Sequence, residues 1–367
     1  MRIARKIRSL APYVYGEQPK ARNVIKLNTN EAAYLPSPRV MSVLKTFDPE
    51  SLRRYPNATS ADLRAELAKL NRTKPENIFV GNGSDEILSL MTDAFVEDDE
   101  SIGSLDPSYS LYKVLADIRG VKWTPIADPY VKRIPDCKGK VALAYITNPN
   151  NPTGTMIPPA AIASFAKRFR GVVVVDEAYV HYARTNCMSL ATAKSNRNII
   201  VMRTFSKAYS LAGLRVGYCV GPRDLIDALY KIKDSYNVDA IAQALALAAV
   251  KDQKGLKAML KKVLATRKWF IAELVKRGWD VLPAEANFVF AKPPVAAGKR
   301  KEEKGKRGSG PLTACEKAQH LFTKLRARNI FIRYFKGPKT GDRVRISIGT
   351  DAQMKRVLRE IDDILEA

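Results

Sequence analysis

The chain of 367 residues contains only two histidines and four cysteines. His181 and His320 belong to no metal-ligand pattern, so the sequence predicts no zinc or iron site. The cysteines lie far apart and form no CxxC pair, which favours free thiols in a reducing cytoplasm. No stretch approaches 18 consecutive apolar residues, and the basic segment 1–10 lacks the apolar core of a secretory signal. We therefore expect a cytoplasmic protein with no membrane span.

Acidic residues are in deficit, since 62 Lys and Arg face 37 Asp and Glu, for a formal net charge of +25. Such a charge attracts phosphates, anionic substrates and, without specificity, nucleic acid. Part of the excess lies in segments 1–26 and 292–307, and the rest is spread through ordinary helical segments. We interpret the charge as a property of the surface, with no specific nucleic-acid partner. A nucleic-acid-binding protein on an inactive enzyme scaffold is the alternative from another class.

Short apolar runs alternate with segments of helical periodicity along the first 253 residues. The runs that predict strands are 78–80, 101–105, 141–147, 172–175, 198–203 and 216–220. Because these runs are continuously apolar and separated by helices, they indicate a mainly parallel sheet covered on both faces. The sequence therefore predicts an α/β fold, in which ligands bind at the carboxyl ends of the strands.

A second, smaller α+β lobe is expected after a long amphipathic helix at 254–277 that joins the two lobes. We divide the chain into an N-terminal arm (1–34), a large domain (35–253) and a small C-terminal domain (254–367). Within the small domain, segment 292–312 is rich in Lys, Gly, Pro and Glu, a composition typical of a flexible surface loop.

Lys207 lies in the run Thr204-Phe205-Ser206-Lys207, eight positions before Arg215 and in otherwise apolar surroundings. A lysine is rarely buried unless it is paired or covalently engaged. Its amine can form a Schiff base with an aldehyde, for which pyridoxal phosphate (PLP) is the usual partner. Thr204, Ser206 and Arg215 are suitable donors to the phosphate of such a cofactor. The alternative is a loop lysine with its amine in water.

Two further motifs follow predicted strands. Gly81-Asn82-Gly83-Ser84-Asp85 leads from a strand into a helix, where backbone N–H groups and the helix dipole favour an anion. Its glycines match neither GxGxxG nor GxxxxGK[ST], which disfavours a dinucleotide or ATP site. Asn148-Pro149-Asn150-Asn151-Pro152-Thr153-Gly154 predicts a rigid turn that presents amide side chains at the end of the sheet, although its role could be structural.

Asp176 directly follows four valines, at the mouth of an apolar strand. A buried carboxylate needs a cationic partner, and a pyridinium nitrogen is one; a helix N-cap is the structural alternative. Tyr179, three residues on, could reach the phenolic oxygen of the same ring. Tyr109, just after Pro107, could stack on its face.

Together, in this order, these motifs resemble the fold-type I PLP-dependent aminotransferases, and more closely the histidinol-phosphate aminotransferases. The resemblance extends from Pro12-Tyr13 to Ile348-Gly349-Thr350. It implies an aspartate-aminotransferase-like fold, with a mainly parallel seven-stranded sheet in the large PLP-binding lobe and a smaller α+β lobe. It also implies a homodimer that transfers an amino group between histidinol phosphate and 2-oxoglutarate, giving imidazole-acetol phosphate and glutamate in histidine biosynthesis.

The resemblance implies a role for each matching residue. Lys207 would be the Schiff-base lysine and the general acid/base, and Asp176 would hold the pyridinium nitrogen protonated. Asn151 and Tyr179 would contact the ring oxygen, and Tyr109 would stack on the ring. The remaining cofactor contacts, all to the phosphate, would come from Ser84, Asp85, Thr204, Ser206, Arg215 and the neighbouring subunit's Tyr55. The substrate would be bound by the anion-binding Arg333 and Arg345 together with Tyr13, Asn30, Glu31 and Asn151.

The sequence departs from the family pattern in a substrate-side loop. The family's Asn-Glu-Asn-Pro-Tyr-Gly is here Asn30-Glu31-Ala32-Ala33-Tyr34-Leu35. In addition, His181 stands where an acidic residue is common, and the loop 292–312 is longer than expected. The first departure leaves two related activities open, those of an aromatic-amino-acid aminotransferase and of a threonine-phosphate decarboxylase.

Overall fold

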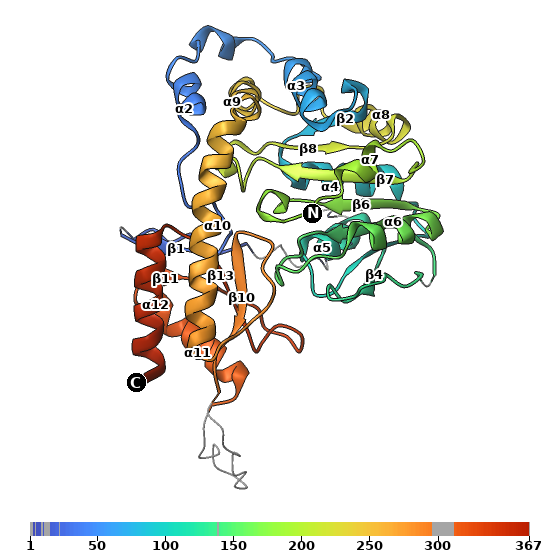
Figure 1. Ribbon diagram of the computed structural model, residues 1–367. Helices are drawn as coiled ribbons and strands as arrows, with labels where there is room; N and C mark the ends of the chain where they lie inside the picture. The colour runs from blue at the N-terminus through green and yellow to red at the C-terminus, as the bar shows by residue number, and fades with distance from the viewer. Residues whose placement is uncertain are drawn as a thin grey trace.

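The protein is described here by a computed structural model, shown in Figure 1, that covers residues 3, 5–8, 10, 15–21, 23–137, 139–295 and 312–366. Tyr13 and most of the predicted basic loop 292–312 lie outside these residues, so their predicted roles remain predictions. In the described part of the chain, no helix is both long and apolar enough to cross a membrane.

A seven-stranded sheet forms the centre of the larger lobe. Its order is β2 (Ile78–Gly81), β8 (Gly217–Val220), β7 (Ile199–Thr204), β6 (Val172–Asp176), β5 (Val141–Thr147), β3 (Ser101–Leu105) and β4 (Lys122–Ala127). β8 is antiparallel to both of its neighbours, and all other neighbouring strands are parallel. The predicted mainly parallel, seven-stranded sheet is confirmed.

Both faces of this sheet are covered by helices. Successive side chains of a strand point to opposite faces, so the continuously apolar strands place apolar side chains on both faces of the sheet. Val173 and Val175 pack in one hydrophobic cluster and Val174 in the other. The first cluster includes side chains of α3 (Ala61–Asn71), α6 (Pro159–Arg168), α7 (Met188–Thr192) and α9 (Ala240–Lys251), and the second those of α4 (Gly83–Phe95), α5 (Leu111–Arg119) and α8 (Arg223–Ile232).

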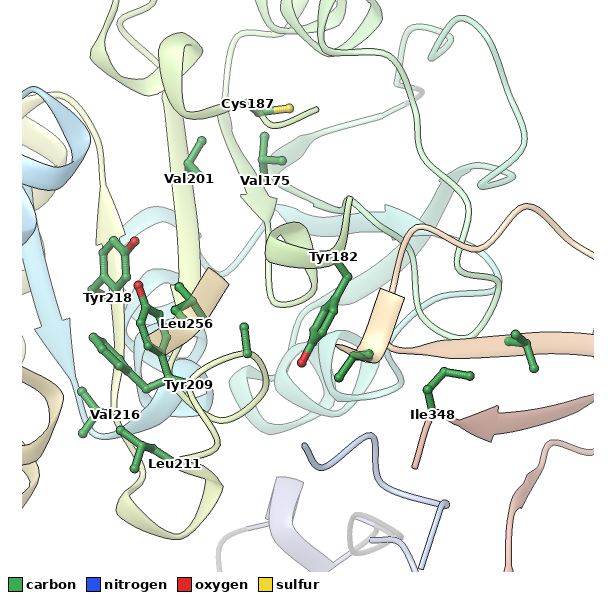
Figure 2. Packing of buried hydrophobic residues seen from close by; sticks show 14 of the residues in the cluster. Val175, Tyr182, Cys187, Val201, Tyr209, Leu211, Val216, Tyr218, Leu256 and Ile348 are labelled. Carbon is green, nitrogen blue, oxygen red and sulfur yellow. The ribbon is translucent and has the colours of Figure 1, made fainter. Parts of the chain in front are cut away.

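The first cluster continues from the sheet into the smaller lobe. Figure 2 shows Val175 and Val201 of the central strands in this cluster, together with Tyr209 from the segment after β7. Leu256 of α10 (Gln253–Lys276) and Ile348 beyond β13 (Val344–Ser347) belong to the same cluster. Burial of these apolar side chains stabilises the contact between the lobes.

The smaller lobe contains a four-stranded antiparallel sheet. Its order is β12 (Arg333–Tyr334), β13, β10 (Phe288–Lys292) and β9 (Asp280–Val281), and its helices are α11 (Ala314–Ala327) and α12 (Asp351–Glu366). Helix α10 runs from the large lobe to the small lobe and lies alongside α12 (Figure 1). β1 (Ile25–Lys26) pairs with β11 (Ile330–Phe331), which ties the N-terminal segment to the small lobe. The domain boundaries at 34/35 and 253/254 remain predictions.

The sequence did not predict β4, α7 or α8. β4 is an edge strand that contains Pro125 and exposes Lys122, so it lacks the apolar run that marks the central strands. Helix α8 has only two buried residues, Ile226 and Leu229. Segment 330–334 forms two short strands, β11 and β12, which belong to different sheets. The remaining helices of more than three residues are α1 (Arg5–Arg8), α2 (Pro38–Lys45) and the 3-10 helix η1 (Pro49–Arg53).

Candidate active site

The predicted functional segments meet at one edge of the large sheet. Asp176 ends β6, Lys207 follows β7 and Asn148–Gly154 follows β5, while Asp106–Tyr109 follows β3. These strands are parallel neighbours, so their carboxyl ends lie together. The parallel topology therefore brings the segments that contain these residues to one place.

Lys207 points toward the N-terminal segment. Its Nζ donates a hydrogen bond to the backbone oxygen of Thr29 at 2.9 Å and lies 5.9 Å from the ring centre of Tyr179. Burial lowers the pKa of Lys207 to about 8, and the positive charge of Arg345 acts in the same direction. The neutral, nucleophilic amine is therefore populated at a lower pH than in a solvated lysine.

Asp176 is a buried carboxylate, 4% exposed, whose partners are neutral donors. Tyr112 donates its hydroxyl hydrogen to Oδ2 at 2.8 Å, and the backbone N–H of Ala178 donates to Oδ1 at 3.0 Å. Burial raises the pKa of Asp176 to about 6, and these hydrogen bonds oppose the rise. Within the described residues no Lys, Arg or His forms an ion pair with Asp176. A buried carboxylate with this surrounding fits a ligand that brings its own cation, such as a pyridinium nitrogen.

The next residue, Glu177, is also buried but has a protein cation. Arg203 Nη2 lies 2.7 Å from Glu177 Oε2, and the backbone N–H of Cys187 donates to Oε1. Burial raises the pKa of Glu177, and Arg203 opposes that rise. The two adjacent carboxylates therefore differ in function: Glu177 belongs to a structural ion pair that the sequence did not predict, and Asp176 faces the site.

Tyr112 is the site residue that the sequence analysis missed. It is fully buried, and its hydroxyl lies between Asp176 and Thr147, 2.6 Å from Thr147 Oγ1. Its ring stacks on Tyr145 (centres 4.6 Å apart) and meets Tyr109 edge-on at 5.7 Å. Burial and the nearby Asp176 raise the pKa of Tyr112, which keeps the phenol protonated as a donor. The signal that could have found it is its position three residues after Tyr109, the tyrosine expected at the cofactor ring.

An anion-binding cradle forms where α4 begins beside β8. Arg215 Nη2 lies 3.2 Å from Asp85 Oδ2, and Arg215 Nη1 is 3.4 Å from Ser206 Oγ, which also accepts a hydrogen bond from Thr204. Gly83 has a φ of +79°, and a Cβ there would lie 2.6 Å from Arg215 Nη2.

Glycine is also required on the neighbouring strand. A Cβ on Gly217 would lie 2.7 Å from the backbone nitrogen of Ser84. The two glycines thus keep open the space in front of a helix N-terminus that has hydroxyl and guanidinium donors beside it. This combination of donors and space fits a phosphate group.

The residues expected around the cofactor ring are linked to one another and to the small lobe. Tyr109 donates its hydroxyl hydrogen to Asp85 Oδ1 at 3.4 Å. The Tyr179 hydroxyl accepts a hydrogen bond from Asn30 Nδ2 at 3.0 Å. Asn151 Oδ1 accepts a hydrogen bond from Arg345 Nη1. The predicted positions of these side chains near Lys207 and Asp176 are therefore mutually compatible.

Arg333 and Arg345 stand directly opposite each other on β12 and β13. Arg345 is 5% exposed; its Nη2 donates to the backbone oxygen of Asn28 at 2.7 Å, and its guanidinium lies over Phe335, 5.2 Å from the ring centre. Arg333 is half-buried and lies 5.4 Å from the same ring. Among the described residues, no carboxylate forms an ion pair with Arg333. Two adjacent guanidinium groups suit an anionic substrate.

Tyr55 and Glu31 were also predicted to belong to the site. Tyr55 is 81% exposed and stacks on Tyr236, with ring centres 4.4 Å apart. Glu31 is paired with Lys26 at 2.5 Å, and its negative charge partly offsets the lowering of the Lys207 pKa by burial. The contact of Tyr55 with a neighbouring subunit and that of Glu31 with substrate therefore remain predictions.

Comparison with known proteins defines the class to which this fold and site belong. The family model for aminotransferase class I and II matches residues 22–361. The chain therefore belongs to the class I and II aminotransferase family. Within it, the chain is 40% identical over 365 residues to the histidinol-phosphate aminotransferase of Geobacter sp. (strain M21), covering 98% of this chain and 97% of that protein. It is 39% identical over 367 residues to the histidinol-phosphate aminotransferase of Syntrophotalea carbinolica, covering 99% of each.

Solved structures show the same likeness. The fold superimposes on the histidinol-phosphate aminotransferase of Sinorhizobium meliloti, solved in complex with pyridoxal 5'-phosphate, with a TM-score of 0.86, 26% identity and coverage of 100% of this chain and 98% of that one. The L-threonine-O-3-phosphate decarboxylase of Porphyromonas gingivalis has a TM-score of 0.74 at 21% identity, covering 94% of this chain and 100% of that one, which shows a shared fold alone. The predicted aspartate-aminotransferase-like fold is confirmed.

Proposed function

We propose that this protein is a PLP-dependent aminotransferase that exchanges an amino group between histidinol phosphate and 2-oxoglutarate, a step of histidine biosynthesis. The observation that carries the proposal is a lysine with a lowered pKa at the same sheet edge as a buried carboxylate, Asp176, which forms no ion pair with a cation of the described residues. The relatives named histidinol-phosphate aminotransferase support the choice of substrate.

The residues of the site fit pyridoxal phosphate. When bound, this cofactor supplies an electron sink for the cleavage of a bond at the substrate's Cα. Asp176 would hold its ring nitrogen, and Tyr179 and Asn151 would contact its ring oxygen. Tyr109 would cover one face of the ring. The phosphate would be held by Ser84, Asp85, Thr204, Ser206, Arg215 and, in a dimer, the neighbouring subunit's Tyr55.

The side chains around the substrate would bind the substrate, orient it and move a proton. Lys207 would take the proton from the substrate's Cα as a general base, a role that its lowered pKa favours. Arg333 and Arg345 would bind the phosphate of histidinol phosphate in one half-reaction and a carboxylate of glutamate in the other. Asn30 positions Tyr179 by their hydrogen bond, and Tyr13 and Glu31 would line the substrate side.

The assembly is part of this proposal. A homodimer with shared sites is supported by the exposed Tyr55 and Tyr236, since large aromatic side chains in contact on a surface are typical of an interface. Mixing the Tyr55→Ala and Lys207→Ala variants tests it. If sites are shared, the mixture recovers part of the activity that each variant lacks; a mixture no more active than its components would exclude sharing. We also keep the predicted cytoplasmic location as part of the proposal.

The test of function is a spectrophotometric half-reaction on protein reconstituted with PLP. Histidinol phosphate, phenylalanine, threonine phosphate and glutamate are added separately, and the loss of the cofactor's visible absorbance is followed. We expect the highest rate per unit concentration with histidinol phosphate. Preference for phenylalanine would indicate an aromatic-amino-acid aminotransferase, and carbon dioxide release from threonine phosphate would indicate a decarboxylase. Protein that binds no PLP but binds DNA in a salt-sensitive manner would favour the inactive scaffold instead.

A further inference from the structure

Lys339 forms a contact between the lobes that lies outside the constellation described above. It belongs to the segment 335–343, which connects β12 to β13 in the small lobe. Its Nζ lies 3.0 Å from Asp106 Oδ2 and 2.9 Å from Asp128 Oδ1, and it donates to the backbone oxygen of Asp106 at 3.1 Å. One ammonium group of the small lobe therefore contacts three oxygens of the large lobe.

The two carboxylates come from neighbouring strand ends in the large sheet. Asp106 follows β3 and Asp128 follows β4, and the backbone N–H of Asp106 donates to the oxygen of Ala127 at 2.9 Å. Two carboxylates that are both within 3.0 Å of one ammonium group would repel each other if that cation were absent. Lys339 supplies that cation, and the two carboxylates in turn raise its pKa.

Each end of this contact continues into a predicted binding segment. Asp106 is followed by Pro107, Ser108 and Tyr109, and Tyr109 is the residue proposed to stack on the cofactor. Ser108 Oγ donates to Asn150 Oδ1 at 3.0 Å, which ties this loop to the turn that contains Asn151. In the small lobe, Lys339 lies in the segment that connects β12, which contains Arg333, to β13, which contains Arg345.

A second contact between the lobes lies near the first. Arg345 of the small lobe donates to Asn151 of the large lobe. The segment that contains the two arginines is thus in contact with the cofactor side through Arg345 in β13 and Lys339 in the connection before it. Elsewhere in the small lobe, the backbone N–H of Glu285 donates to the oxygen of Gly154 at 2.8 Å.

We propose that Lys339, Asp106 and Asp128 form an electrostatic clasp that holds the small lobe closed and places Arg333 and Arg345 for anion binding. Lys339 is a positioning residue in this proposal, because it touches neither cofactor nor substrate. The side chains are about half exposed, so salt screens the clasp. The proposal rests on the proposed aminotransferase function for its kinetic readout.

The test compares Lys339→Met with Lys336→Met in the PLP-loaded enzyme. Lys336 is an exposed lysine three residues earlier in the same connection, and among the described residues it forms no ion pair. We expect Lys339→Met to raise KM for glutamate by about three- to tenfold, with kcat changed less than twofold. We expect Lys336→Met to leave both constants as in the wild type. Lys339→Arg keeps the charge, so its KM for glutamate should be close to the wild-type value.

Salt dependence and a double variant separate the clasp from a merely structural role. Salt weakens anion binding by the two arginines in both proteins, but it screens the clasp only in the wild type, so the wild-type KM should rise more steeply with sodium chloride than that of Lys339→Met. Asp128→Asn should add little to Lys339→Met. Equal KM values and equal salt dependence in wild type, Lys339→Met and Lys336→Met would overturn the proposal. Because glutamate is the measured donor, a wild type that uses glutamate but not histidinol phosphate would refute the proposed substrate and still test the clasp.

Discussion

The hydroxyl of Tyr112 donates to Asp176 Oδ2 at 2.8 Å and connects the carboxylate to Thr147. Tyr112 is therefore a partner of the carboxylate that remains when no cofactor is bound. The hydrogen bond stabilises the ionised form of Asp176 and so opposes the effect of burial on its pKa.

Replacing Tyr112 by Phe should keep the ring stacked on Tyr145 but remove this donor. We expect the pKa of Asp176 to rise further, kcat to fall about tenfold, and the free energy of unfolding to fall by about 1–3 kcal/mol. Tyr145→Phe is the control, because Tyr145 is equally buried and donates to the oxygen of Leu88 instead. Calorimetry and steady-state kinetics measure both. An equal loss of kcat in both variants would show that the loss of a buried hydroxyl in general, and not of the hydrogen bond to Asp176, lowers the activity.

Asp176 should make the stability of the cofactor-free protein depend on pH. Its pKa is about 6 when folded and about 4 in an unfolded chain, so the folded state binds the proton more tightly. Its contribution to stability is greatest below the unfolded pKa and is lost as the pH rises through 6, by about 3 kcal/mol in total. Asp176→Asn should lack this dependence. Urea unfolding of both proteins from pH 4 to pH 7.5 measures the difference, and parallel curves would contradict the assignment.

Lys207 should set the pH dependence of PLP capture. Since the neutral amine is the nucleophile and the pKa of Lys207 is about 8, the rate of PLP capture should rise about tenfold per pH unit below 8 and level off above it. Lys207→Ala should abolish transamination while its far-UV circular dichroism and thermal transition match the wild type. Stopped-flow absorbance provides the rates. A capture rate that still rises beyond pH 10 would indicate a solvated lysine.

Gly217 should be required for cofactor affinity. A Cβ at this position would lie 2.7 Å from the backbone nitrogen of Ser84, so Gly217→Ala should displace a predicted phosphate donor and weaken PLP binding at least tenfold. Gly213→Ala is the matched control in the same region, since nothing lies within 4 Å of its added Cβ. Equilibrium dialysis of PLP measures both affinities. Unchanged affinity in Gly217→Ala would place the phosphate elsewhere.

How well the sequence predicted each element depends on how clearly its residue pattern differs from that of a loop. Strand β5 was predicted with its observed bounds because its apolar run is continuous. Edge strand β4 was missed because it begins with the exposed Lys122 and its apolar residues are interrupted by Thr124 and Pro125. His181 was noted as a departure from the family; its buried ring lies edge-on to Tyr209, and burial lowers its pKa to about 3, so it is a neutral packing residue.

The sequence by itself determined the α/β class, the ends of the central strands, and the position of Lys207 and Asp176 at two of those ends. Local periodicity and residue type are sufficient for these, because a parallel sheet brings every carboxyl strand end to one edge. Only the tertiary structure decided which partner each of these side chains has. Lys207 meets Thr29 from 178 positions away, Arg345 meets Asn28 from 317, and Lys339 meets Asp106 from 233. Such contacts depend on how the lobes pack, which no local pattern of residues records.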